Sequence, residues 1–542
     1  MITIDRVLAV VDRPDIPAPT IDYGLLMPLI VVFAVAMLGL IVEIVVPRDK
    51  RFVSQVVVAV GGLLAGLAST IKLYLDLSEA EGSVLARGQI GGVGSVAVDG
   101  PGVVTWGLIL VFSILSMLLF AERSYEGGLS AFTGRASDAP GSKDEAEATA
   151  ARLEHTEVFP LAIFAVVGMM LFAVSHDLIT MFVALEVLSL PLYVLAGLAR
   201  RKRLISQEAA LKYFLLGAFA SAFFLYGAAL AYGFSGSLNL TEINAAITAR
   251  DDAQPLILGS IAMIAVGLLF KIGAAPFHSW TPDVYQGAPT PVTAFMASAT
   301  KVAAFIALMR VFFVGFGGAS WDWRPVVWAI AIATMLIGSV VAIAQTDIKR
   351  MLAYSSVAHA GFALVGFSGA YMGTEGTESV TSISAVLFYM LAYGLATIGS
   401  FAVVMVVRDS SGETTELSKW AGLAKQSPWL AGAVTVYMLS FMGIPLTAGF
   451  IGKWAVFSAA WAGGTPALVV FAVLMSAVAA VFYLRVIVLM YFAEPVGEGP
   501  TVALPGVLTT VVIALTVIGT IAFGVFPGVV IDLVQHAGAF VR

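Results

Sequence analysis

Two lysines lie within apolar sequence in the stretch FKIGAAPFHSWTPDVYQGAPTPVTAFMASATKV, which covers residues 270–302. Lys271 and Lys301 each fall in a run of apolar residues that is long enough to cross a lipid bilayer. A lysine at the centre of a spanning helix costs roughly 2.5–3.5 kcal/mol, so an intramembrane amine marks a candidate functional site. Burial disfavours the charged form of an amine and a nearby carboxylate favours it, so a partner that moves can drive proton uptake and release. The two lysines therefore predict proton-transfer chemistry.

Further charged residues fall well inside apolar runs, namely Glu186, Lys212, Lys453 and Arg485. Glu186, in TMFVALEVLSLPLYV, has two interpretations: a fixed ion pair that ties helices together, or one member of a titrating network. The lysines in the next three runs favour the network, and we expect Glu186 to pair with Lys271. Arginine keeps its proton, so Arg485 suits a fixed structural pair better than a relay.

A histidine, His359, lies in the stretch SSVAHAGFALVG of another apolar run. A single intramembrane histidine can be a hydrogen-bonded structural residue or a proton relay. Its position in the sequence between Lys301 and Lys453 favours the relay. The candidate polar links around it are Tyr389, Tyr393 and Tyr437.

Two of the apolar runs contain residues that break helices. Glycine permits unusual backbone dihedrals and proline removes a backbone donor, so Gly273 and Pro276 predict a discontinuous helix next to Lys271. Gly443 and Pro445 interrupt a later run in the same way, shortly before Lys453. Broken helices are tolerated in a bilayer only where they are buried in protein or line a water-filled cavity, and they recur at the ion sites of transporters.

The composition is that of a polytopic membrane protein. Of 542 residues, 59% are hydrophobic and 12% are charged, against about 25% charged in a soluble domain. The chain has no cysteine, which excludes iron–sulfur clusters, thiolate zinc sites and disulfides within it. There is no basic stripe with interleaved aromatic residues, so nucleic acid is not an expected partner. The first residues lack the pattern of a cleavable secretory signal.

Apolar runs of about 20 residues, the length that a hydrocarbon core of roughly 30 Å requires, recur along the chain. We place fourteen of them, at residues 24–46, 53–75, 102–121, 158–175, 178–199, 207–233, 255–273, 290–315, 325–345, 350–371, 382–407, 428–462, 466–492 and 505–526.

These runs predict an all-α fold with about 14 transmembrane helices, of which helices 7 and 12 are broken. Because the two broken helices are five helices apart, we expect helices 4–8 and 9–13 to be two five-helix repeats, and an odd number of helices gives them inverted topology. The expected regions are a three-helix N-terminal region (1–121), a cytoplasmic loop insert (122–157), the two repeats (158–315 and 325–492), and a C-terminal helix and tail (493–542).

The distribution of Lys and Arg in the loops predicts the orientation of the chain. With both ends outside, sixteen basic residues fall in cytoplasmic loops, including the run Arg200–Arg203, and six fall on the other side. We therefore expect both termini on the periplasmic or extracellular face. The insert 122–157 is expected to be a solvated cytoplasmic linker.

Three long stretches occur in a family-specific order: the segment at 270–305, QTDIKRMLAYSSVAHAGF and LSFMGIPLTAGFIGKW. With them, the chain resembles the antiporter-like membrane subunits of respiratory complex I, which are relatives of Mrp-type cation/proton antiporters. The resemblance covers nearly the whole chain from about residue 20. Within that family, the stretch FYMLAYGLATIGSF and the lysine at position 453 favour one of the three types of chain.

The resemblance implies roles for individual residues. Glu186 matches the fifth-helix glutamate, Lys271 its partner on the broken seventh helix, Lys301 the lysine of the central axis, and Lys453 the residue nearest the outlet. Lys212 and His359 match positions associated with the polar axis.

The resemblance also implies a multisubunit proton-translocating NADH:quinone oxidoreductase in the bacterial cell membrane. This chain would translocate protons and hold no cofactor, while FMN, iron–sulfur clusters and quinone would bind to partner subunits. Its partners would be the other membrane and peripheral subunits, and membrane lipid.

Two alternative functions remain at this point. The first is a subunit of an Mrp-type cation/proton antiporter, which would need no electron-transfer partner. The second is a purely structural membrane scaffold, which the buried titratable residues on broken helices disfavour, since apolar packing would serve a scaffold better.

Overall fold

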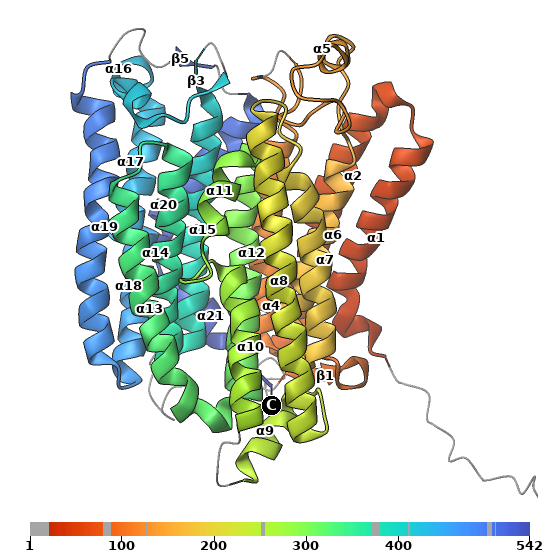
Figure 1. The fold of residues 1–542 in the computed structure, drawn as a ribbon, viewed down its shortest axis with the longest axis vertical. Coiled ribbons are helices and arrows are strands. Elements are labelled where there is room, and N and C mark those ends of the chain that lie inside the picture. Colours follow the sequence, from red (N-terminus) through yellow and green to blue (C-terminus); the bar gives the residue numbers. More distant parts are fainter. Residues whose placement is uncertain are drawn as a thin grey trace, which may run out of the picture.

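The computed structural model describes residues 21–79, 88–125, 128–250, 255–370, 380–409, 412–495, 501–503 and 506–541. The expectation about a secretory signal concerns residues that mostly lie outside these ranges. The described residues form a bundle of long helices that run roughly parallel or antiparallel to one axis, with a few short strands at the two ends (Figure 1). The predicted all-α fold is confirmed.

Each predicted apolar run coincides with a helix or an interrupted pair of helices. In chain order they are α1 (Tyr23–Val45), α2 (Arg48–Glu79), α4 (Gly100–Phe120), α6 (Val158–Val174), α7 (Leu178–Ala196), α8 (Arg203–Ser235), α10 (Pro255–Ile272) with α11 (Trp280–Gly287), α12 (Thr290–Arg310), α13 (Ser320–Ile343), α14 (Ile348–Gly369), α15 (Ser382–Val406), α17 (Pro428–Met442) with α18 (Ala448–Ala462), α19 (Pro466–Phe492) and α20 (Val507–Val525).

By length and apolar composition, 12 helices among the described residues can cross a membrane. The apolar helices α6 and α17 are shorter, with 17 and 15 residues. The chain is therefore a polytopic membrane protein, and fourteen spans remains a prediction.

Short elements occupy the two ends of the bundle. At the lower end in Figure 1 lie the antiparallel pair β1 (Gln89–Gly91) and β2 (Val96–Val98), and the helices α9 (Leu240–Thr248) and α21 (Gly528–His536). At the upper end lie α5 (Lys143–Ala150), α16 (Leu423–Gln426) and a small antiparallel sheet in the order β4 (Gly412–Glu413), β3 (Val407–Asp409), β5 (Thr501–Val502). The remaining turns are η2 (Gly92–Gly94), η3 (Val311–Gly315), η4 (Gly317–Ala319) and η5 (Leu417–Trp420).

Aspartates begin several of the long helices. The carboxylates of Asp22, Asp99, Asp177 and Asp347 accept hydrogen bonds from backbone N–H groups in the first turns of α1, α4, α7 and α14. The first N–H groups of a helix have no partner within the helix, so a side-chain acceptor satisfies them and fixes where the helix starts.

The centre of the bundle is formed by α12, α14 and α15. Helix α15 packs against both α12 and α14, and Lys301 on α12 donates a hydrogen bond to a backbone carbonyl of α14. The apolar cores of α12 and α15 are entirely buried, and that of α14 is 94% buried. By contrast, only 28% of the corresponding stretch of α1 and 33% of that of α19 is buried, so these helices present apolar faces outward, as lipid contact requires. Polar groups on the three central helices are thus shielded by protein.

Both predicted helix breaks are present. The chain leaves α10 at Gly273, which has a positive φ of 73°, and resumes as α11 at Trp280. It leaves α17 at Gly443, with φ 80°, and resumes as α18 at Ala448. In Figure 1, α10 lies below α11 whereas α17 lies above α18, so the two interrupted helices run in opposite directions.

The start of α1 and the C-terminal end of the described chain lie on one side of the bundle (Figure 1). Figure 1 shows that α1 begins at the lower end, where the C-terminus also lies, while α5 of the insert lies at the upper end. The insert is joined to the basic run, since the N–H of Thr133 donates to the carbonyl of Leu198 and the guanidinium of Arg200 donates to the carbonyl of Ser130. The insert and the basic run therefore share one face, as expected.

Candidate functional site

Lys271 lies at the end of α10, directly before the break. Its buried Nζ donates hydrogen bonds to Ser189 Oγ on α7 (2.8 Å) and to Tyr213 OH on α8 (3.3 Å). Trp280, the first residue of α11, stacks on Tyr213 and donates its indole N–H to the carbonyl of Phe270 (3.0 Å). A cation at the C-terminal end of a helix is stabilised by the helix dipole, so the break creates a place for the ammonium group.

Glu186 does not form the direct pair with Lys271 that we expected. The ammonium group contacts Ser189, which lies one helical turn after Glu186 on α7, and no salt bridge joins the two charged residues in the described structure. One carboxylate oxygen of Glu186 is buried without a hydrogen-bond partner among the described residues. Glu186 is thus one helical turn from the residue that binds the amine, and its carboxylate has an acceptor that is not in use.

Lys301 lies in the middle of α12, and its side chain is buried. Its Nζ donates to the backbone carbonyl of Ser356 on α14 (2.7 Å) and lies 5.6 Å from the ring centroid of Tyr393 on α15. The hydroxyl of Ser356 is 3.4 Å from Tyr285 OH, which comes from α11. Lys301 thereby contacts both other central helices, and Ser356 links it to the second half of the broken helix.

His359 is bound at both ring nitrogens. Its Nδ1 lies 2.6 Å from Tyr389 OH on α15, and its Nε2 lies 3.0 Å from Tyr483 OH on α19. Tyr483 OH also contacts Ser355 Oγ, one turn before the histidine on α14. A hydroxyl can donate and accept, and an imidazole has one nitrogen of each kind when neutral, so this group can pass a proton or hold a fixed arrangement. The expected link through Tyr389 is present.

Lys453 lies in α18, directly behind the second break. Its Nζ donates to the carbonyls of Phe441 and Met442 at the end of α17 (2.8 and 2.9 Å) and to Ser476 Oγ on α19 (2.7 Å). The ammonium group therefore caps the C-terminal end of a half-helix. Lys271 is placed similarly, in the last turn of α10. The Nζ of Lys453 lies 4.8 Å from the ring centroid of Phe362 on α14.

Lys212 lies outside this buried row, contrary to its expected place on the polar axis. Its side chain is 43% exposed, and its Nζ lies 2.8 Å from both Glu208 and Asp283. Asp283 also pairs with Arg350 (2.7 Å). These contacts form an ion-pair network around the start of α14.

Arg485 and Tyr437 have structural contacts. The guanidinium of Arg485 donates to the carbonyls of Ile343 and Gln345 at the end of α13, in line with the structural interpretation. Tyr437 OH contacts the carbonyl of Ile513 and the hydroxyl of Thr516, so it joins α17 to α20 and lies outside the row.

The side chains that touch the candidate site residues form a continuous series of contacts across the bundle. In order from α7 to α18 they are Ser189, Lys271, Tyr213, Trp280, Tyr285, Ser356, Lys301, Tyr393, His359 and, through Phe441, Lys453. Glu186 lies one helical turn before Ser189 on α7. The series is hydrogen-bonded near each amine and near the imidazole. Between Tyr213 and Tyr285, between Lys301 and His359, and between His359 and Phe441, it consists of aromatic contacts.

Several residues of this series escaped the sequence analysis. Ser189 lies three residues after Glu186, and Ser355 and Ser356 lie four and three residues before His359, which places them on the same helix faces as those residues. Helical spacing from a charged residue was therefore an available signal for them. Tyr213 and Tyr483 had no such signal, because their partners come from distant helices.

A second buried charged group, Arg310, was also missed. Its guanidinium forms two hydrogen bonds with the carboxylate of Asp99 (2.7 and 2.8 Å) and donates to the carbonyl of Ala173 (2.9 Å). Both charged side chains are fully buried. The backbone N–H of Val541, near the C-terminus, donates to the same carboxylate (3.1 Å). This paired and hydrogen-bonded group is a structural element outside the row.

Comparison with known proteins gives consistent results. Residues 175–479 match the family model described as NADH:quinone oxidoreductase/Mrp antiporter, TM. The NADH-quinone oxidoreductase subunit N of a Nocardioides species is 55% identical over 535 residues, which cover 97% of this chain and 100% of the relative. The protein of the same name from Rhodococcus opacus is 51% identical, with 100% of both chains covered.

Solved structures give the same fold. A chain of respiratory complex I from Thermus thermophilus with bound aureothin is 32% identical, with a TM-score of 0.73 over 95% of this chain and 100% of that one. A chain of the Mrp complex from a Dietzia species has a TM-score of 0.75 over 94% and 97%, at 19% identity, which shows a shared fold.

Proposed function

Because this chain belongs to the NADH-quinone oxidoreductase subunit N family, we propose that its buried row of amines and imidazole carries protons across the membrane. The chain is an antiporter-like membrane subunit of respiratory complex I, a multisubunit enzyme in which it works with other subunits. NADH oxidation and quinone reduction take place in those other subunits.

The observation that carries the proposal is the burial of three lysines and a histidine in one series of contacts. Lys271, Lys301, His359 and Lys453 are all 3–5% exposed. Burying an amine is costly, and apolar side chains would stabilise the bundle better if these positions had only to pack. Groups that exchange protons near neutral pH are what a proton-conducting row needs.

The role of Glu186 follows from its place on α7, one helical turn from Ser189, which binds the Lys271 amine. When the carboxylate approaches, it stabilises the ammonium form, and when it withdraws, Ser189 and Tyr213 remain as neutral partners that favour the ammonium form less. Movement of Glu186 would therefore change how strongly Lys271 holds its proton. The contact with Ser189 represents the withdrawn arrangement.

The two breaks give the amines freedom to respond. Lys271 and Lys453 each lie beside a half-helix end, where backbone carbonyls and the dipole stabilise a cation without a fixed carboxylate partner. A proton can thus be held at either end of the row, with Lys301 and His359 between them. We assign Lys271 to the inner part of the path and Lys453 to its outlet.

The proposal includes the placement of the chain in its complex. FMN, the iron–sulfur clusters and quinone belong to partner subunits, and the chain lies in the bacterial cell membrane with both termini on the periplasmic or extracellular side. The regions 1–121, 122–157, 158–315, 325–492 and 493–542 are its working divisions, with 158–315 and 325–492 as inverted repeats. The opposite directions of α10 and α17 support the inverted arrangement.

An Mrp-type antiporter subunit is the alternative function. Affinity purification of the tagged chain from its native membrane discriminates the two. The proposal expects the chain to co-purify with subunits that oxidise NADH and reduce quinone. If the membrane oxidises NADH and reduces quinone but the chain is recovered in an assembly that lacks this activity, the complex I assignment is excluded.

A further inference from the structure

A polar cavity of about 390 Å³ lies between the turn that joins α1 to α2 and the insert that follows α4. It is lined by residues 43–52 on one side and by residues 123–157 on the other. The row of buried lysines takes no part in it. The cavity is at the end of the bundle that carries α5, so it opens at the face with the excess of Lys and Arg (Figure 1).

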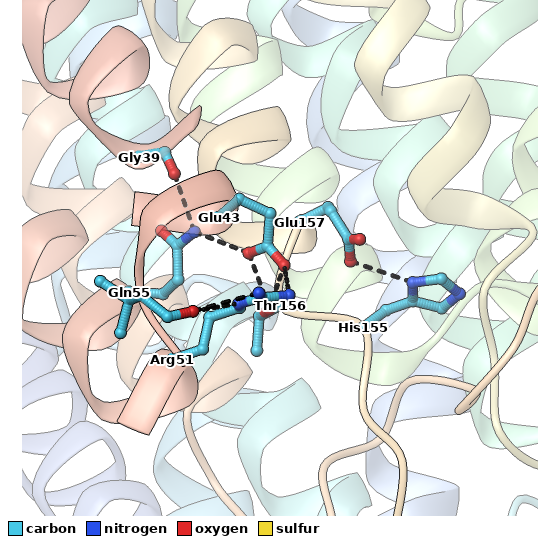
Figure 2. Close-up of polar contacts among 8 residues, drawn as sticks. Gly39, Glu43, Arg51, Gln55, His155, Thr156 and Glu157 are labelled. Atoms are coloured by element: carbon cyan, nitrogen blue, oxygen red, sulfur yellow. Dashed lines mark hydrogen bonds and ion pairs between the residues drawn. The ribbon is translucent and has the colours of Figure 1, made fainter. Parts of the chain in front are cut away.

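The carboxylate of Glu43, in the wall of the cavity, already accepts hydrogen bonds from other side chains of the protein. Glu43 accepts hydrogen bonds from Arg51 Nη1 (2.7 Å), Gln55 Nε2 (2.9 Å) and Thr156 Oγ1 (2.7 Å), as Figure 2 shows. These contacts join α1 and α2 to the end of the insert. Gln55 also donates to the carbonyl of Gly39 (2.9 Å), which anchors the wall within the α1–α2 hairpin.

The other acidic residues of the wall are largely engaged. Glu154 pairs with Arg123 and accepts from the N–H of Ser130 (2.7 Å). Glu157 contacts His155 (3.0 Å), whose hydrogen bond holds the pKa of Glu157 below its usual value (Figure 2). Asp49 is the one carboxylate of the lining that has no ion pair within the described ranges.

The basic residues of the lining outnumber the acidic ones, with five arginines against four carboxylates. Arg51 and Arg123 are paired with Glu43 and Glu154. The guanidinium groups of the other three, Arg48, Arg135 and Arg152, make no side-chain hydrogen bond or ion pair within the described part of the chain. These three arginines come from separate segments of the chain. The fold therefore brings their positively charged hydrogen-bond donors to one cavity without supplying side-chain acceptors for them.

Exposed apolar residues, which form an apolar edge, flank the part of the cavity wall that the α1–α2 turn provides. Ile44, Val45 and Val53 flank the turn between α1 and α2, and they are 82%, 71% and 61% exposed. Only 28% of the apolar stretch of each of these two helices, α1 and α2, is buried, so most of their apolar surface faces outward. A ligand that fits both the arginines of the cavity and the apolar edge has an anionic head group with several hydrogen-bond acceptors, and an apolar tail.

We propose that this cavity binds the phosphate group of an anionic phospholipid, whose acyl chains lie along α1 and α2. Guanidinium groups match phosphate oxygens with paired N–H donors. Basic pockets at the cytoplasmic surface of membrane proteins attract anionic headgroups. A free phosphate ion would use the same guanidinium groups but would gain nothing from the apolar edge.

The test uses the whole purified complex and a phosphatidylglycerol analogue that carries a photoreactive group beside its headgroup. Illumination is expected to label peptides from residues 43–53 and 134–157 of this chain. Unlabelled phosphatidylglycerol should compete, whereas phosphatidylcholine and inorganic phosphate at equal concentration should not. Labelling that phosphatidylcholine suppresses equally overturns the specificity for an anionic lipid, and equal suppression by inorganic phosphate overturns the lipid in favour of a free ion.

Variants locate the site. Arg135→Gln and Arg152→Gln should each weaken competition by phosphatidylglycerol about fivefold, since a basic residue near the surface contributes ~1 kcal/mol to the attraction of anionic lipid. Lys50→Gln is the matched control, because Lys50 lies in the same turn as Arg48 and does not line the cavity. Because Arg135 and Arg152 have no side-chain partner to lose, the complex should assemble. Unchanged competition in both assembled variants, or an equal loss in Lys50→Gln, contradicts the proposal.

Discussion

Lys453 illustrates how a single cation can be held within this bundle without a carboxylate. All three of its donors are used, two of them by carbonyls at the end of α17 and the third by Ser476. The contact depends on Gly443, whose φ of 80° lies in a region that favours glycine. A Cβ at that position would lie 2.8 Å from Cδ of Lys453, so the break and the lysine are matched to each other.

The identities of the site residues could be predicted from the sequence, whereas their partners could not. An ammonium or carboxylate group in an apolar run is visible in the sequence because its cost in lipid is independent of the neighbours. The hydrogen bond of Lys271, however, goes to Ser189, 82 residues away. The same limit explains the expected direct contact with Glu186, since the sequence places the two on neighbouring helices but does not fix which turn of α7 faces the amine.

We expect Glu186 and Lys271 to be functionally coupled. Glu186→Gln and Lys271→Ala should each lower NADH-driven proton uptake in membrane vesicles by roughly 10²-fold, the scale of a lost proton-transfer group. The double variant should cost little more than one single variant, because both groups serve the same step.

Proton uptake is measured for the two single variants and the double variant, and assembly of the complex is checked in parallel. Losses that simply add in the double variant would show that the two residues act independently, even if each one matters.

Among the elements, the broken helices were the most predictable. Gly273 and Gly443 take positive φ values, and the prolines that follow cannot continue a helix, so local chemistry alone dictates both interruptions. The small sheet at the upper end of the bundle was not predicted. The sheet formed by β3, β4 and β5 joins residues 407–413 to 501–502, and pairing over that distance leaves no local pattern.

Glu122 connects two helices that are far apart in sequence, and it predicts a pH dependence. Its carboxylate accepts from the N–H of Ser124 (2.9 Å) and from the N–H and hydroxyl of Thr509 (3.2 and 2.9 Å), at the start of α20. Burial alone would raise the pKa of Glu122, but the hydrogen bonds from Ser124 and Thr509 outweigh burial and lower it. The carboxylate therefore contributes stability that is fully present above the unfolded-state pKa and is lost as the pH falls through the folded-state pKa.

Glu122→Gln is expected to destabilise the docking of α20 by about 1–3 kcal/mol at pH 7, because it weakens charge-assisted bonds to buried donors. The difference from the natural protein should shrink as the pH falls below about 4.3, the usual pKa of a glutamate. Thermal dissociation of the purified complex across this pH range measures it. A difference that stays constant with pH would show that the carboxylate charge is not what stabilises the contact.

For the whole molecule, the sequence predicted which loops share a face but not which helices form the centre. The Lys and Arg bias grouped the insert with the Arg200–Arg203 run, and the structure brings them into contact. The full burial of α12 and α15 was not evident, since an apolar helix that faces lipid and one that faces protein have similar compositions. Burial of this kind follows from tertiary packing alone.

The Asp99–Arg310 ion pair holds distant parts of the chain together. It joins α4 to α12 and holds the C-terminal segment through Val541, while the ring of Phe540 lies 4.6 Å from the guanidinium carbon. Asp99→Asn or Arg310→Met alone should destabilise the chain by about 3–5 kcal/mol, because each leaves a buried charge without its partner. The double variant Asp99→Leu with Arg310→Met should be less destabilised than the worse single variant. The yield and thermal stability of the complex rank the three variants by stability. A double variant whose loss of stability equals the sum of the two single losses would contradict this prediction.

The orientation of the whole chain is tested by labelling, since the natural sequence has no cysteine. Pro140→Cys, in the insert, should react with a membrane-impermeant maleimide in inverted vesicles, which expose the cytoplasmic face, and not in intact spheroplasts. Reaction in spheroplasts alone would reverse the proposed placement of both termini.

The central claim is that the buried lysines of the row carry the translocated proton, and Lys301 tests it most directly because it lies on the fully buried α12 at the middle of the row. The measurement is NADH-driven proton uptake by proteoliposomes that contain the assembled Lys301→Met complex. The control is Lys425→Met, at an exposed residue of the short helix α16. We expect a loss of roughly 10²-fold in coupled proton uptake for Lys301→Met and near-natural uptake for Lys425→Met. Near-natural proton uptake in an assembled Lys301→Met complex would contradict it.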